Sequence, residues 1–182
     1  MKNPDQKIIP NQVEEFSQEI QQMRDKDQSA RTKVIELEER NEDASEAWEA
    51  VKEVDRNNTA RMKEIIREIG LPIISKVGKK VYQMAWLLAQ HADDDIEFQK
   101  YYLELMKKAK SGDVLNEDIA YLEDRILRNE DKPQIYGTQL ENNGEPQPME
   151  DPEHVDERRE KMGLDPLAKY IEEFRKVYNV KK

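Results

Sequence analysis

The sequence predicts a mostly α-helical fold, a multi-helix bundle with one long N-terminal helix and a short β-hairpin or structured loop near residues 134–149. Two observations predict the helices: apolar residues recur at steps of three and four along most of the chain, and glycine or proline stands where that pattern stops. Charged residues make up 38% of the chain and the mean hydropathy is −1.03, which is polar for a globular protein. The apolar residues are nevertheless grouped at helical spacing, so a folded helical protein fits better than disorder.

The first helix is expected after a polar lead over residues 1–12. Its apolar residues alternate at three- and four-residue steps, as in a coiled coil. These seam residues are Val13, Phe16, Ile20, Met23, Ala30, Val34 and Leu37. Asp27 interrupts the seam. An acidic side chain there either fixes the register of packing or belongs to a functional site.

The second helix is expected over 44–69, after a break at 41–43, with Gly70 as its C-cap. Asp55 and Asn58 lie on its apolar stripe. They either mark a break in the helix or, in a continuous helix, face the same core as the apolar residues.

The third helix is expected after the turn at Leu71-Pro72, with Ser75 as a candidate N-cap and an inner face that ends in His91. The fourth is expected to begin at Asp94, an N-cap with Glu97 as its capping-box partner, and to end near 111–112. Asn116 is the candidate N-cap of a fifth helix.

The pattern changes over residues 131–151, where several prolines and glycines rule out a helix. Asn143-Gly144 is a hairpin-turn signal, so this segment is expected to form the short β-hairpin or structured loop. Pro152 then opens a sixth helix that ends at Gly163, and Asp165-Pro166 starts the last one.

Length and composition limit the classes of protein that fit. A chain of 182 residues suits one domain, expected over 13–180. The net charge of −10 disfavours nucleic-acid binding, although a local basic pocket can still hold a small anion. The absence of cysteine excludes disulfides, thiolate metal sites and cysteine nucleophiles. No apolar run is long enough for a membrane span and the N-terminus is not a secretory signal, so a cytoplasmic location is expected.

Several polar residues lie on helix faces that should be apolar. Burying a polar group without a partner costs about 1–3 kcal/mol, so folds keep such groups inside when they are paired or functional. The residues are Asp27 with Gln28 and Arg31 beside it, Asp55, Asn58, His91, Gln99, Arg125, Arg158 and Arg159. Each of these residues also has a purely structural explanation. For example, His91 is near a helix C-terminus, where the helix dipole favours an imidazolium, and Arg158 and Arg159 can extend to solvent. Together, on stripes that must face one core, they indicate a polar site.

Four segments, in this order and spacing, carry a resemblance to a known family: WLLAQHADDDIEFQ (86–99), LEDR (122–125), QIYGTQ (134–139) and VDERREKMGLDPL (155–167). The chain resembles a widespread, largely bacterial family, domain of unknown function 6624. The earlier DQSAR (27–31), VDRNNT (54–59), GLP (70–72) and VG (77–78) are similar to it as well. Ile73-Ile74 departs from the family, in which a more polar turn is expected.

The resemblance covers roughly residues 13–178 and carries no reaction. It implies that the polar motif residues form a shared site. In this chain they are Asp27, Gln28, Arg31, Asp55, Asn58, Gln90, His91, Asp93, Gln99, Asp124, Arg125, Gln134, Tyr136, Gly137, Gln139, Arg158 and Arg159.

The first functional hypothesis is an enzyme or ligand-binding protein for a small anionic or amide-containing molecule. His91 is the leading general acid/base candidate, with Asp93, Asp124 and Tyr136 as further catalytic candidates and the other motif residues as ligand-binding ones. Hydrolysis or group transfer is expected by elimination, since no P-loop, GxSxG, HExxH or Rossmann fingerprint occurs. No cofactor and no metal are expected; a metal variant would use His91 with Asp27, Asp55 or Asp93.

The second hypothesis is a non-enzymatic interaction or scaffolding module. Its long first helix would dock a partner or form a homo-oligomer, and its polar core would be structural. A cavity lined by His91, Arg125 and Tyr136 would favour the first hypothesis, and a solid core with every arginine paired would favour the second. The other histidine, His154, lies in an acidic turn and is expected at the surface.

Overall fold

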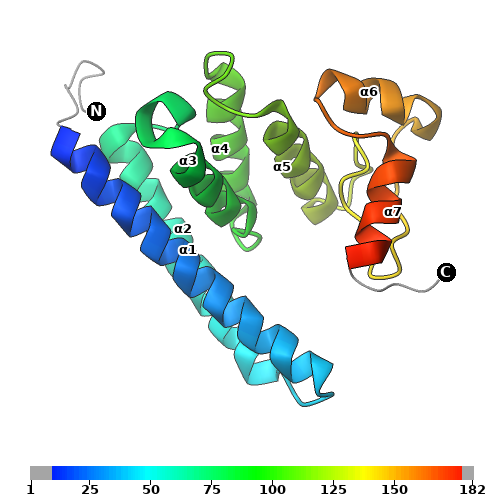
Figure 1. Ribbon diagram of the computed structural model, residues 1–182, viewed down its shortest axis with the longest axis horizontal. Coiled ribbons are helices and arrows are strands. Elements are labelled where there is room, and N and C mark those ends of the chain that lie inside the picture. Colours follow the sequence, from blue (N-terminus) through cyan, green and yellow to red (C-terminus); the bar gives the residue numbers. More distant parts are fainter. Residues whose placement is uncertain (1–9, 178–182) are drawn as a thin grey trace. The chain divides into compact units, whose positions relative to one another are not determined.

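The structure, a computed structural model, describes residues 10–177 of the chain. Seven α-helices and no β-strand occur in this range, which confirms the mostly α-helical fold with its long N-terminal helix (Figure 1). The helices are α1 Pro10–Glu39, α2 Ser45–Ile69, α3 Ile74–Gln90, α4 Ile96–Lys108, α5 Asn116–Asn129, α6 Val155–Lys161 and α7 Leu167–Val177, with a short 3-10 turn at Pro152–His154. None of the helices in this range is both long and apolar enough to span a membrane.

The described residues form two compact units. The first comprises residues 10–98 and 109–113, and the second comprises 99–108 and 114–177, so the boundary falls inside α4. The expected single domain over 13–180 stays a prediction, as does the polar lead over 1–12. Residues 1–9 of the polar lead and residues 178–180 of the expected domain lie outside the described residues.

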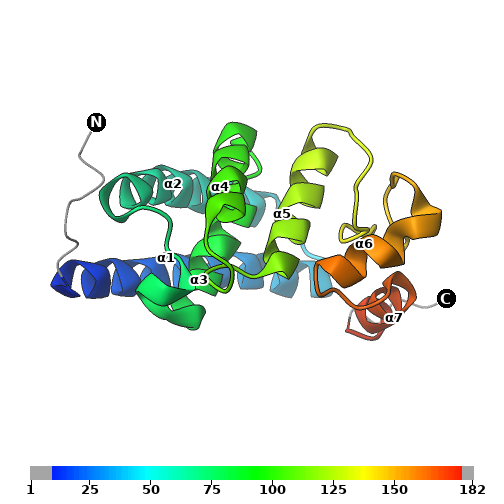
Figure 2. The ribbon, with the colours of Figure 1, turned by 90° about the horizontal axis from the view of Figure 1, so that it is seen from above.

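The first unit is built on a hairpin of α1 and α2, which lie side by side with α3 packed against both (Figures 1 and 2). α2 runs unbroken through Asp55 and Asn58, so of the two alternatives for this stripe the continuous helix is correct. The core of the unit includes Phe16, Ile20, Met23, Val34, Val51, Met62, Ile65, Tyr82 and Leu88. Four of the seven seam residues of α1, namely Phe16, Ile20, Met23 and Val34, are thus buried within the unit, and the other three are half-buried.

The helix ends confirm one predicted cap and correct three. Gly70 caps α2 with φ of 71°, as expected. Ser75 does not cap α3, because Asp113 accepts the backbone N–H of Ser75 at 3.1 Å and supplies the cap from outside the helix. Asp95, and not Asp94, caps α4 by accepting the backbone N–H of Phe98 at 3.0 Å.

The third correction concerns α5. Asn116 is its first helical residue, and the capping position belongs to Leu115, whose side chain has no oxygen. α3 also bends near its start, because Gly78 has φ of 79° and ψ of 157°, a conformation that glycine adopts readily and that interrupts the helix.

In the second unit, ion pairs join Lys107 of α4 to Glu123 of α5 and Lys100 of α4 to Glu130, the residue that follows α5. After α5, residues 131–151 form a structured loop, so the loop alternative holds and no hairpin strands form. Two isolated bridges occur, Gln134 with Met149 and Leu140 with Pro146, around a turn at Gly144. Pro146 and Pro148 lack the N–H donors that a longer ladder needs.

Candidate functional site

The first unit brings together charged residues from three helices. Asp27, Gln28 and Arg31 lie on α1, Asp55 lies at the middle of α2, and His91 is the C-cap residue of α3. Asp27 occupies the predicted gap in the apolar seam and is 1% exposed. Because the seam faces α2 and α3, its one acidic member meets polar side chains from both helices. Asp27 is therefore buried where it interrupts the seam, and it belongs to a cluster of charged side chains.

Arg31 is the centre of this cluster. The Nη2 nitrogen of Arg31 donates to both carboxylate oxygens of Asp55, at 2.9 and 2.8 Å. Its Nε lies 3.2 Å from Asp27 Oδ1 and 3.1 Å from His91 Nδ1. A guanidinium presents several donors in one plane, so a single arginine can neutralise two carboxylates that would otherwise repel each other.

The contact between His91 Nδ1 and Asp27 Oδ1, at 2.8 Å, fixes the histidine ring. Nδ1 cannot donate to Asp27 and accept from Arg31 at the same time. The pKa of Asp27 is lowered to about 2, so this carboxyl group is ionised at neutral pH and can only accept hydrogen bonds. The Nδ1 proton therefore points to Asp27, and Arg31 donates to the same carboxylate. The other ring nitrogen, Nε2, then carries the free lone pair, and no residue of the range 10–177 bonds to it. This is the arrangement of a histidine oriented by an acid for proton transfer.

The two carboxyl groups have opposite pKa shifts. Burial works to raise the pKa of Asp27, but hydrogen bonds from His91 and Gln28 and the nearby positive charges outweigh it and lower this pKa to about 2. Burial raises the pKa of Asp55 to about 6 although Arg31 lies against it, and the charge of Asp27 adds to the rise. Neighbouring acids whose pKa values are pushed apart can take different roles in proton transfer.

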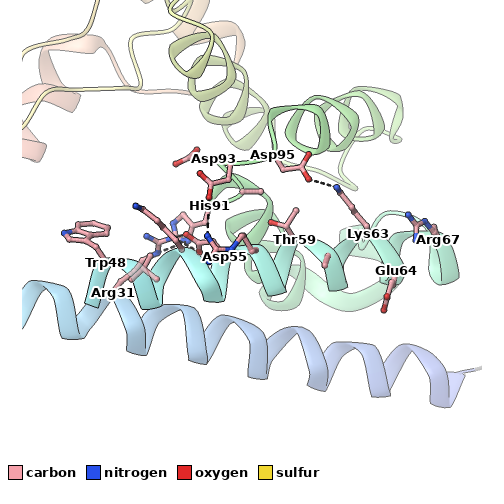
Figure 3. Close-up of a pocket in the computed structure, with 16 residues that line it drawn as sticks. Arg31, Trp48, Asp55, Thr59, Lys63, Glu64, Arg67, His91, Asp93 and Asp95 are labelled. Carbon is pink, nitrogen blue, oxygen red and sulfur yellow. Dashed lines mark hydrogen bonds and ion pairs between the residues drawn. The ribbon is translucent and has the colours of Figure 1, made fainter. Parts of the chain in front are cut away.

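A cavity of about 650 Å³ borders this cluster (Figure 3). His91, Arg31 and Asp55 lie on its wall. A five-turn stripe of α2 forms one side, and the turn after α3, including Asp93, forms the other. Figure 3 shows the labelled α2 side chains in a row from Trp48 at one end to Arg67 at the other. All the lining residues belong to the first unit, so Arg125 and Tyr136, expected beside His91, are not among them.

One group among the described residues has the composition of a metal site. Ligand atoms of Asp27, Asp55 and His91 lie within 4.8 Å of one another. The guanidinium of Arg31 contacts all three side chains and already supplies the positive charge between them. A metal ion would have to displace Arg31, so the donor set fits an arginine-bridged cluster better than a cation site.

In the second unit, Asp124 organises the loop of residues 134–139. It is fully buried, and its carboxylate accepts the backbone N–H groups of Ile135, Tyr136 and Thr138 as well as the Thr138 hydroxyl, at 2.7–3.2 Å. Burial raises the pKa of Asp124, while these hydrogen bonds oppose the rise. The contacts account for this residue as an anchor of the loop.

Gln134 and Gln139 continue that network. The Gln134 amide donates to the carbonyls of Gln139 and Gln147 at 3.0 and 2.9 Å, and its oxygen accepts the backbone N–H of Gln139 at 2.9 Å. Gly137 has φ of 67°, and a Cβ there would approach Leu167 Cδ1 to 3.0 Å. The glycine therefore serves close packing within the unit.

The two adjacent arginines of α6 bind backbone carbonyls. Arg158 donates to the carbonyls of Ile135 and Glu150, at 2.8 and 2.7 Å. Arg159, 1% exposed, donates to Tyr136 and Asp165 at 2.7 and 2.6 Å and lies 5.0 Å from the Tyr170 ring centroid. Both guanidinium groups are thus used to hold the loop to α6.

The matching family model covers residues 14–182 and is described as a family of unknown function (DUF6624). The chain belongs to this DUF6624 family. No curated protein and no solved structure matches the chain. The family description names no reaction, so the reaction has to be inferred from the geometry of the site.

The DUF6624 motif residues divide between the two units. Asp27, Gln28, Arg31, Asp55 and His91 meet in the charged cluster, and Asp93 lines the cavity beside it. Asn58 is buried in the same unit, and its Nδ2 has no partner among the described residues. Gln90, also in this unit, is half-buried and has polar contacts.

The second unit holds the other motif residues. Asp124, Gln134, Tyr136, Gly137, Gln139, Arg158 and Arg159 build the loop scaffold, and the Tyr136 hydroxyl lies 3.4 Å from Glu123. Burial raises the pKa of Tyr136 to about 12, so its hydroxyl keeps its proton. Gln99 is fully buried and lies 3.4 Å from Asn129, and Arg125 is half-buried with polar contacts of its own.

Sequence reasoning missed part of the cavity wall. Trp48, Lys52, Arg56 and Lys63 line it from α2. The spacing contained a signal: these residues lie at steps of four, four and seven residues, which keeps them on one side of the helix that carries Asp55. Projecting that face along α2 would have found them.

Proposed function

We propose that the chain binds and transforms a small anionic or amide-containing molecule in the cavity of the first unit, with His91 as the general base and acid. The observation that carries the proposal is the pairing of His91 Nδ1 with the buried, ionised Asp27 while Nε2 stays unpaired at the cavity wall. In this mechanism Nε2 accepts a proton from water or a substrate hydroxyl, and Asp27 stabilises the imidazolium that forms.

Arg31 and Asp55 complete the mechanism. Arg31 holds both aspartates in place and can turn one N–H toward a substrate oxygen. Asp55 accepts hydrogen bonds from Arg31 through both carboxylate oxygens and so keeps the guanidinium beside His91, and the protonated Nε2 of His91 then returns its proton to the leaving atom. The reaction class is hydrolysis or group transfer, with a small molecule as partner, without a cofactor or metal, in the cytoplasm of a bacterial cell.

The test is a thermal-shift screen with nucleotides, sugar phosphates and amino-acid derivatives, repeated on His91→Asn. Asparagine keeps a donor toward Asp27 but removes Nε2, so the fold is retained while proton transfer is lost. His154→Asn is the matched control, because His154 also contacts an aspartate through Nδ1, at 2.9 Å, but is exposed. We expect a ligand that raises the Tm of the wild type and the control, and turnover that His91→Asn lacks.

A second measurement tests the geometry without a ligand. The chain has two histidines, so ¹⁵N shifts of both rings can be assigned by NMR. Neutral His91 should carry its proton on Nδ1. A proton on Nε2, or ligands that stabilise and react equally in His91→Asn, would refute the proposal.

The alternative is a non-enzymatic module that docks a partner or forms a homo-oligomer through α1. Ile35, 55% exposed on this helix, favours it. Ile35 lies outside the predicted seam, whose residues Phe16, Ile20, Met23 and Val34 are buried within the unit, which leaves little apolar surface for a second chain. A mass measurement by light scattering that changed on Ile35→Lys would support this alternative.

A further inference from the structure

The Trp48 end of the cavity has features that the proton-transfer cluster does not use. Trp48 is 43% exposed, although tryptophan is usually well covered. Its indole Nε1 donates to Glu38 Oε1 at 3.1 Å, which holds the edge of the ring. No aromatic or cationic side chain of the range 10–177 stacks on it. A fixed aromatic ring with an open face on a cavity wall is suited to stack on a planar ligand.

Two cations follow Trp48 on the same face of α2. Lys52 and Arg56 come one and two helical turns later, about 6 and 12 Å along the axis, and both line the cavity. Their partners in the structure are surface carboxylates. Lys52 pairs with the exposed Glu49 at 2.7 Å, and Arg56 lies 4.0 Å from the exposed Asp94. Exposed pairs of this kind contribute little, so an incoming anion can replace them.

Asp55 lies between these two cations in sequence and joins this end of the cavity to the proton-transfer cluster. Its carboxylate is bound by Arg31, and Arg31 contacts His91. A ligand that stacks on Trp48 and places an anion by Lys52 or Arg56 therefore has its middle portion beside the cluster. The order along α2 is Trp48, Lys52, Asp55 and Arg56, so the cluster lies between the two cations.

We propose, resting on the function proposed above, that the substrate class is a nucleoside monophosphate, with its base on Trp48 and its phosphate held by Lys52 and Arg56. A single nucleotide fits better than a nucleic acid, because the chain's net charge of −10 repels a long phosphate backbone. Stacking does not depend on the identity of the base, and the cations bind the phosphate electrostatically.

The experiment uses four probes: adenosine monophosphate, adenosine, ribose 5-phosphate and inorganic phosphate. Trp86→Phe leaves Trp48 as the only tryptophan, so quenching of its fluorescence reports contact with the ring. The full-length wild type is titrated in parallel by calorimetry, in case Trp86→Phe perturbs the fold. We expect adenosine monophosphate to quench Trp48 saturably and to bind more tightly than each of the other three probes.

Two variants separate the two halves of the ligand. Trp48→Ala should weaken adenosine monophosphate and adenosine by roughly tenfold, the usual effect of removing one stacking partner, and leave ribose 5-phosphate unchanged. Lys52→Gln with Arg56→Gln should weaken adenosine monophosphate and ribose 5-phosphate but not adenosine. The matched control is Lys79→Gln with Lys80→Gln, two exposed lysines of α3 that do not line the cavity.

Two outcomes overturn the inference: no binding of adenosine monophosphate, or equal binding by the wild type and Trp48→Ala. Neither result alters the tautomer of His91 or the screen with amino-acid derivatives, so a failure here is distinguishable from failure of the proposed function. Failure of both sets of measurements would reject both.

Discussion

Two buried aspartates, one in each unit, have different partners. Asp27 is bound by side chains, namely His91, Gln28 and Arg31, and its pKa is lowered to about 2. Asp124 is bound mainly by backbone N–H groups of the loop, and burial raises its pKa. Side-chain partners can exchange protons or turn toward a ligand, whereas backbone amides can change partner only if the loop unfolds. This difference supports the proposal that the first unit carries the chemistry, whereas Asp124 holds a loop in place in the second unit.

The largest expected effect is that of Asp124→Ala. Removal of the carboxylate leaves the buried N–H groups of Ile135, Tyr136 and Thr138 without an acceptor, which should cost at least about 3 kcal/mol of unfolding free energy. Urea unfolding followed by circular dichroism measures it. Asp131→Asn is the control, since Asp131 is exposed and its φ of 57° suits asparagine. A loss under about 1 kcal/mol would show that Asp124 does not anchor the loop.

A smaller effect, with a sign that depends on pH, is expected at the charged cluster. The pKa of Asp55 rises on folding from 3.8 to about 6, so its native state holds the proton more tightly and stability should increase as pH falls from about 6 to 4. The pKa of Asp27 falls from 3.8 to about 2, so its contribution is present above pH 4 and is lost as pH falls toward 2. These two changes form the upper and lower limbs of a plot of unfolding free energy against pH. Each limb should be on the order of 2 kcal/mol.

Variants assign the two limbs. In urea unfolding at a series of pH values, Asp55→Asn should remove the limb between pH 6 and 4, and Asp27→Asn the limb below pH 4. Glu53→Gln, which removes an exposed carboxylate of α2, should leave both slopes intact. If Asp55→Asn kept the upper limb, the opposite shifts of the two carboxyl groups would be wrong.

The smallest effect is expected at His154, the exposed counterpart of His91. Hydrogen bonding to Asp151 raises the pKa of His154 above 6.5, so Asp151→Asn should return it toward that value while unfolding stays unchanged within error. NMR titration of the ring protons measures the shift. An unchanged His154 titration in Asp151→Asn would mean that this surface pair does not form in solution.

The sequence predicted more of the fold than of the site. Repeated apolar steps located seven helices, and glycine marked the end of α2, because these signals are local. Caps were less reliable: Asp113 caps the turn at Ser75 from 38 residues away, a contact that no local pattern contains. The prolines near Gly144 signalled the loop and also explain why no hairpin strands form.

The amino-acid sequence identifies side chains that are costly to bury: Asp27 interrupts an apolar seam, so it needs a polar partner wherever that seam packs. The identity of the partner follows from the packing of the helices. His91 lies 64 residues from Asp27 and Asp55 lies 24 residues from Arg31, and these pairs meet only because α1, α2 and α3 pack together. Packing also places the Asp124 carboxylate where backbone N–H groups of a loop donate to it. In the first unit, it leaves the nitrogen Nε2 of His91 unpaired at the cavity wall.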